Sequence, residues 1–72
     1  MMNIDAAGKI IRHRRKELGV DQRTLAQLAD VSVHTVSDIE SGKGNPTIEV
    51  LGKVLDVLGL ELSIRTKFSQ ER

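Results

Sequence analysis

The sequence predicts an all-α domain of four short helices followed by one C-terminal β-strand. Three observations lead to this fold class. Apolar residues recur at helical spacing in four segments, turn-forming residues separate these segments, and strict apolar–polar alternation replaces the helical period after Gly59. The 72 residues have room for one domain with a modest core. Because Phe68 is the only aromatic residue, that core must consist of Leu, Ile, Val and Ala.

Residues 6–18 form the first predicted helix. Asp5 is its expected N-cap, and Gly19 stands just beyond its C-terminal end. Gly8 costs about 1 kcal/mol relative to Ala, so the first turn is expected to be weak. The helical spacing predicts a buried stripe made of Ala7, Ile10, Ile11 and Leu18.

Two further helices follow each other closely between residues 22 and 41. The first is capped by Asp21 and spans residues 22–29, and the second is capped by Ser32 and ends at Gly42. Each has one apolar face, made of Leu25, Ala26 and Ala29 in the first and Val36 and Ile39 in the second. Two short helices joined by so brief a turn cross steeply and share one core, as in a helix-turn-helix motif.

The segment Gly42-Lys43-Gly44-Asn45-Pro46 is the clearest loop in the chain, because two glycines and a proline do not continue a helix. Thr47 then caps a fourth helix that ends before Gly59. Its apolar residues recur at the helical period and are Ile48, Leu51, Val54, Leu55 and Leu58.

Residues 60–66, LELSIRT, alternate apolar and polar side chains, which predicts a half-buried strand. No other segment has this pattern, so a partner strand must come from a second copy of the chain. We expect antiparallel pairing across a homodimer, with Leu60, Leu62 and Ile64 as the dimerisation residues. The alternatives are an extended tail on the monomer or a weak fifth helix. The expected domain is therefore residues 1–66, and residues 67–72 are an expected disordered tail.

Composition sets the broad class of the protein. The formal net charge is +1, yet the basic residues cluster near the N-terminus. Through residue 23 there are only three acidic residues but six basic ones, which are Lys9, Arg12, Arg14, Arg15, Lys16 and Arg23. The absence of cysteine fits a cytoplasmic location and excludes disulfides and thiolate metal sites. No apolar run approaches the roughly 20 residues of a membrane span, and no signal peptide is apparent. We expect no membrane association.

The third helix has an outer face suited to a DNA groove, with short and mostly polar side chains. These candidate base-contact residues are Val33, His34, Thr35, Ser37 and Asp38. Val33 and the Thr35 methyl group can contact a thymine methyl, His34 can donate or accept a hydrogen bond, and Asp38 can accept one from cytosine N4. For His34, an ordinary exposed helix position is an equally good interpretation. Because the set lacks Arg, Asn and Gln, sequence preference is expected to depend partly on DNA shape.

With these residues identified, the chain resembles the Xre/Cro-type helix-turn-helix family over about residues 4–59. The matching elements are Arg15 four residues before Gly19, LGVDQ (18–22), Leu25-Ala26, Val31-Ser32, IESG (39–42) and NPT (45–47). The resemblance implies a lambda repressor-like fold that binds DNA. One departure is Asp30, where the family often has Gly; Asp tolerates a left-handed backbone. The strand in place of a fifth helix is most similar to the HipB-type antitoxins, which pair C-terminal strands and repress an operon encoding a kinase-like toxin.

Contacts to DNA phosphates are expected at two places. The start of the second helix offers free backbone N–H groups, and in the resembled family the residue matching Gln22 contacts the DNA backbone. Lys43, Gly44 and Asn45 follow the third helix and can present amides and one ammonium group to a second phosphate; a plain flexible loop is the alternative. The full phosphate-contact set is Gln22, Arg23, Ser32, Lys43, Gly44 and Asn45. The resemblance further implies an ion pair between Arg15 and Glu40 that ties the first helix to the third.

The sequence therefore predicts a sequence-specific repressor that binds a palindromic operator as a homodimer. It is expected to be the antitoxin of a toxin–antitoxin operon, with a kinase-like toxin as partner. The alternatives are a free-standing or phage-type repressor, a module that chiefly neutralises a toxin, and a helix-turn-helix domain that only dimerises. His13 and His34 lie on different elements, and no phosphate loop or metal-ligand spacing occurs. No enzyme activity, cofactor or metal is expected.

Overall fold

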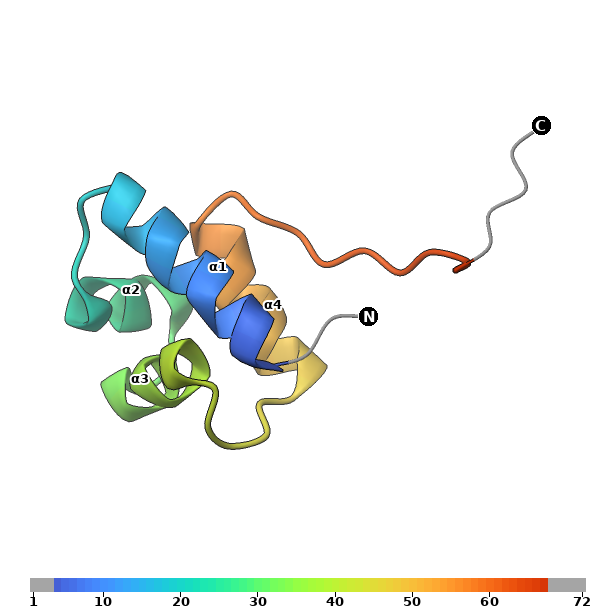
Figure 1. Cartoon of the computed structure of the whole chain (residues 1–72). Helices are drawn as coiled ribbons and strands as arrows, with labels where there is room; N and C mark the ends of the chain where they lie inside the picture. The colour runs from blue at the N-terminus through green and yellow to red at the C-terminus, as the bar shows by residue number, and fades with distance from the viewer. Residues whose placement is uncertain (1–3, 68–72) are drawn as a thin grey trace.

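Four helices pack around one core in the computed structural model, which describes residues 4–67 (Figure 1). They are α1 (Ile4–Glu17), α2 (Gln22–Ala29), α3 (Val33–Ser41) and α4 (Ile48–Val57). α1 packs against α3, and α2 packs against both α3 and α4. The predicted four-helix, all-α fold is confirmed. No helix in residues 4–67 is long and apolar enough to cross a membrane.

All four helical segments contribute to the core. Its largest fully buried side chains are Ile11, Leu25, Val36, Ile39, Val54 and Leu58. Burying one such side chain stabilises the fold by about 1.5–3 kcal/mol. Ala26 and Ala29 are also buried, and their small side chains let α2 approach its neighbours closely.

The three predicted caps of α2, α3 and α4 are confirmed. Asp21 Oδ1 accepts the backbone N–H of Thr24 at 2.7 Å. Ser32 Oγ accepts that of Thr35 at 3.0 Å, and Thr47 Oγ1 accepts that of Val50 at 3.1 Å. Each cap satisfies one donor that the helix itself leaves unpaired. Asp30 takes the left-handed conformation at φ 58° and ends α2, as its tolerance for that region predicts.

Three features of α1 and α4 differ from the sequence prediction. α1 begins at Ile4, so Asp5 lies within its first turn and is not the N-cap. Ile10 is 56% exposed and Leu18 is half exposed, since Ile10 lies to one side of the buried stripe and Leu18 follows the end of the helix. Ile48 is 70% exposed because the first residue of α4 lies beyond the core.

The predicted C-terminal strand does not form in the single chain, and its pairing across a homodimer stays a prediction. Residues 60–66 are extended and form no strand, because no segment within residues 4–67 provides a ladder partner. Figure 1 shows this segment leaving the helices as an arm. Leu60 packs against the core, whereas Ile64 is 88% exposed. Most of the expected disordered tail, residues 68–72 with Phe68, lies outside the described residues.

Gly8 has a structural role that the sequence analysis did not identify. It lies where α1 crosses the C-terminal end of α3, and a Cβ there would stand 2.2 Å from the carbonyl oxygen of Ile39. The same Cβ would stand 3.0 Å from the carbonyl oxygen of Glu40. Glycine is therefore required for the close crossing of α1 and α3.

We expect Gly8→Ala to lower the free energy of unfolding by about 1–3 kcal/mol, because two backbone carbonyl groups would have to move. Gly52→Ala is the matched control, since Gly52 lies in α4 and a Cβ there would meet no heavy atom within 4 Å. This control should raise stability by about 0.5–1 kcal/mol through helix propensity. Urea denaturation measures both changes. Equal stabilisation by the two substitutions would contradict the packing role of Gly8.

Candidate nucleic-acid interface

The five candidate base-contact residues lie on α3, away from its core-facing side. Val36, Ile39 and Glu40 are buried and fix that side of the helix. Val33, His34 and Ser37 are exposed, while Thr35 and Asp38 are half-buried. One face of α3 is thus held by the core, and the other is free to contact a ligand.

Polar side chains on the exposed face of α3 interact with one another. His34 Nε2 lies 3.2 Å from Asp38 Oδ2, one helical turn away. The hydroxyl groups of Ser32 and Thr35 lie 2.9 Å apart. Ser32 therefore has a capping role in addition to its predicted phosphate contact, and Thr35 already has a hydroxyl partner. Neither side-chain pair was predicted from the sequence.

A buried network fixes α3 relative to α1 and α2. Arg15 Nε donates to Glu40 Oε2 at 2.6 Å, and Arg15 Nη2 donates to Glu40 Oε1 at 3.0 Å. Gln22 Nε2 donates to the same Oε1 atom at 3.0 Å. Arg15 Nη1 also donates to the carbonyl oxygen of Val20 at 2.8 Å. The expected Arg15–Glu40 ion pair is present and includes a third member, Gln22.

This network keeps both of its charged members ionised. Burial alone raises the pKa of the Glu40 carboxyl group, but the hydrogen bonds from Arg15 and Gln22 and the charge of Arg15 lower it further than burial raises it. The pKa of Glu40 therefore lies below its ordinary value. The hydrogen bond with Glu40 raises the pKa of Arg15 despite burial. Both charges are compensated inside the protein, as a buried ion pair requires.

The start of α2 remains a candidate phosphate site. The Gln22 side-chain amide donates one of its two hydrogens to Glu40, so the second hydrogen is available to a phosphate. Arg23 is exposed beside it. The N–H of Thr24 is already bound to Asp21, and this bond lowers the pKa of the Asp21 carboxyl group. The candidate donors at this position are therefore Gln22 and Arg23.

The loop after α3 forms the second candidate phosphate site. Lys43, Gly44 and Asn45 are exposed. The Lys43 backbone N–H donates to the carbonyl oxygen of Asp38 at 2.8 Å and is therefore not available to a phosphate. The Lys43 ammonium group remains the candidate donor of this residue. The loop and α3 border a shallow cleft of about 160 Å³ lined by Thr35, Asp38, Ile39 and residues 43–46. The loop thus lies directly beside the exposed face of α3.

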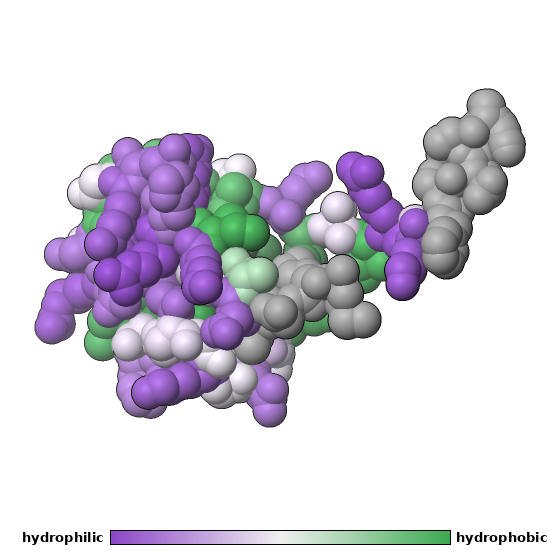
Figure 2. Space-filling view, in the orientation of Figure 1, coloured by the Kyte–Doolittle hydropathy of each residue, from purple (hydrophilic) through white to green (hydrophobic). Residues whose placement is uncertain are grey.

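Arg14 differs from the other basic residues near the N-terminus. Its Nε donates to the carbonyl oxygen of Leu58 at 2.9 Å and ties α1 to the end of α4. Arg12 and Lys16 are exposed, as a solvated face predicts. Figure 2 shows that hydrophilic side chains cover much of the visible surface over the helices.

Comparisons with known proteins agree with this geometry. The family model described as helix-turn-helix matches residues 11–64. Over 58 residues the chain is 40% identical to the HTH-type transcriptional regulator PuuR of Escherichia coli, an alignment that covers 81% of this chain. It covers 31% of PuuR, so the chain spans about a third of the length of that relative.

Two solved structures are similar in fold. The clp gene regulator ClgR from C. glutamicum is 31% identical with a TM-score of 0.77, over 86% of this chain and 80% of that one. The restriction-modification controller protein C.AhdI from Aeromonas hydrophila is 28% identical with a TM-score of 0.75, over 81% of this chain and 84% of that one.

We expect Arg15→Met to lower the free energy of unfolding by about 3–5 kcal/mol, because it leaves the Glu40 carboxylate buried without its cation. The double variant Arg15→Met/Glu40→Met should recover most of this loss, since it removes both buried charges. Urea denaturation measures the three proteins. A double variant as unstable as Arg15→Met would show that uncompensated charge is not the cause.

Proposed function

The chain belongs to the helix-turn-helix family of the Xre/Cro type, and on this premise we propose that it binds double-stranded DNA and regulates transcription as a sequence-specific repressor. The observation that supports this most strongly is the exposed face of α3, which the Arg15–Glu40 pair holds from behind. The similarity to PuuR, a transcriptional regulator by name, points the same way. Such a regulator acts on DNA in the cytoplasm and needs no cofactor or catalytic group.

In the proposed complex, α3 enters the major groove and two flanking sites contact the DNA backbone. The α3 side chains Val33, His34, Thr35, Ser37 and Asp38 contact base edges. Gln22 and Arg23 at the start of α2 contact one phosphate, and Lys43 to Asn45 contact another. Phosphate contacts set orientation and base contacts set sequence preference, so the two groups of residues have separable effects.

We expect His34→Ala and Ser37→Ala each to weaken binding to a preferred operator by about 1–3 kcal/mol at about pH 8, with little change on mixed-sequence DNA. Arg23→Ala should weaken binding to both DNAs and reduce the salt slope by about one. Lys53→Ala is the matched control, because Lys53 is exposed on α4. The operator is first selected from a random library, and fluorescence anisotropy then measures affinity. Equal losses for the Arg23 and Lys53 variants would contradict this docking.

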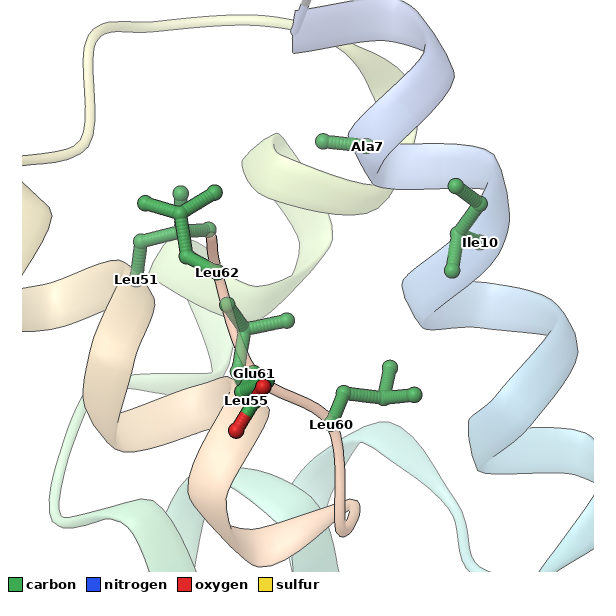
Figure 3. Close-up of a pocket in the computed structure, with 7 residues that line it drawn as sticks. All are labelled: Ala7, Ile10, Leu51, Leu55, Leu60, Glu61 and Leu62. Atoms are coloured by element: carbon green, nitrogen blue, oxygen red, sulfur yellow. The ribbon is translucent and has the colours of Figure 1, made fainter. Parts of the chain in front are cut away.

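We further propose that the protein acts as a homodimer. The observation in favour is an apolar hollow of about 100 Å³ between α1, α4 and the base of the C-terminal arm (Figure 3). Its lining residues are Ala7, Ile10, Leu51, Leu55, Leu60, Glu61 and Leu62. Ile64 continues the apolar face of the arm beyond this hollow. In a two-fold dimer the arms pair as antiparallel strands, and Ile64 of each copy is covered by the other.

Ile64→Asp should convert the dimer to a monomer at about 10 µM, because it places a charge in the proposed interface. Ser63→Asp is the matched control: Ser63 is the neighbouring exposed residue and lies on the opposite face of the alternating segment. Sedimentation velocity distinguishes the two states. A wild-type chain that sediments as a monomer at this concentration, or an Ile64→Asp chain that sediments as a dimer, would refute the arm-paired interface.

A second candidate is an antitoxin that represses its own operon and binds a kinase-like toxin. The exposed side chain of Ile64 favours it as an alternative to arm pairing, because it offers a protein partner a contact separate from α3. The test is co-expression with the product of the adjacent reading frame. A toxic neighbour that is neutralised by this chain and co-purifies with it supports the antitoxin. If the adjacent gene product is harmless and does not co-purify with this chain, the free-standing or phage-type repressor is supported instead.

A further inference from the structure

We propose that His34 and Asp38 act as one pH-dependent unit, in which protonation of His34 neutralises Asp38 and strengthens the binding of α3 to DNA. This inference rests on the proposed function and adds a regulatory property to the same site. It begins from the position of the two side chains. They lie one turn apart on the exposed face of α3, with Nε2 and Oδ2 separated by 3.2 Å.

The pair is open to a ligand. The His34 side chain is 84% exposed and that of Asp38 is 35% exposed. The other ionisable residue of α3, Glu40, is buried and paired with Arg15 on the opposite face. His34 and Asp38 therefore determine the charge that the exposed face of α3 presents to DNA.

Charged groups of the surrounding elements also lie near this pair. Lys43 lines the same cleft as Asp38. Other charged groups near α3 include Asp5 beside Gly42, Arg12 and Arg15 beside Glu40, Arg23 on α2, and Asp30 in the turn before α3. Among the side chains of proteins, histidine is the one that ordinarily changes its charge between about pH 6 and pH 8.

The two charge states of the pair have different consequences for DNA binding. With a neutral imidazole, the Asp38 carboxylate is a net negative charge that DNA phosphates repel. A protonated imidazole cancels this charge and can donate a hydrogen bond. Each phosphate contact adds about 0.9 to the salt slope, so one further contact at about 0.1 M salt corresponds to roughly five- to tenfold tighter binding. Affinity is therefore expected to rise as pH falls.

His13 provides a matched control within the same chain. Its Nε2 lies 3.7 Å from Glu17 Oε2, also at a spacing of four residues, but on α1. The His13 side chain is exposed like that of His34. The two histidines thus have similar local chemistry and differ in their position relative to the proposed DNA-binding face.

The experiment measures binding of the full chain to a mixed-sequence duplex of about 30 base pairs, at about pH 6 and about pH 8 and constant salt. Mixed-sequence DNA isolates the charge effect from base readout. Wild type and His13→Gln should bind at least about fivefold more tightly at the lower pH, and more if both copies of a dimer contact the duplex, whereas His34→Gln should change less than about twofold. Asp38→Asn should bind more tightly than wild type at the higher pH, because it removes the same negative charge without protonation.

Equal affinity of the wild type at the two pH values would overturn the inference, and so would an unchanged pH dependence in His34→Gln. In either case, retained DNA binding would leave the proposed function intact. Failure of the folded wild type to bind DNA at both pH values would instead reject the proposed function, and the inference with it. Circular dichroism of each variant at both pH values establishes that the compared proteins are folded.

Discussion

The buried carboxylate of Glu40 is the point on which the arrangement of α1, α2 and α3 depends. It accepts two hydrogen bonds from Arg15 on α1 and one from Gln22 at the start of α2, while Arg15 also holds the carbonyl group of Val20 before α2. One side chain of α3 thus fixes both elements that flank it. Such a pair adds little net stability compared with an apolar replacement. It specifies one geometry, because any arrangement that separates the two side chains leaves an uncompensated buried charge.

Close packing at the same crossing restricts how α3 can move. Gly8 lets α1 contact the backbone of Ile39 and Glu40, so the C-terminal end of α3 is held by sterics as well as by charge. The opposite face of α3 is left with small and polar side chains. This division explains why one short helix can contribute both to the core and to a proposed DNA-binding surface, with each role assigned to a different face.

Features set by local sequence could be predicted from the residues alone, and features set by tertiary contacts could not. The caps at Asp21, Ser32 and Thr47 follow from residue type and position, and the Arg15–Glu40 pair followed from a family resemblance. The role of Gly8 depends on the carbonyl groups of Ile39 and Glu40, more than thirty residues away, so its sequence context suggested only a weak turn. Alternation in residues 60–66 indicated a strand, but a strand also needs a partner that the single chain does not supply. The bond between Gln22 and Glu40 likewise required the fold.

The most direct measurement is a nuclear magnetic resonance titration of the isotope-labelled chain with its selected operator. If α3 enters the groove and the two flanking sites contact phosphates, backbone amide signals should shift most at Gln22, Arg23, residues 33–38 and residues 43–45. Signals of the exposed α4 residues Lys53 and Asp56 should change least. Shifts concentrated on α4 and the C-terminal arm, with α3 unaffected, would contradict the proposed interface.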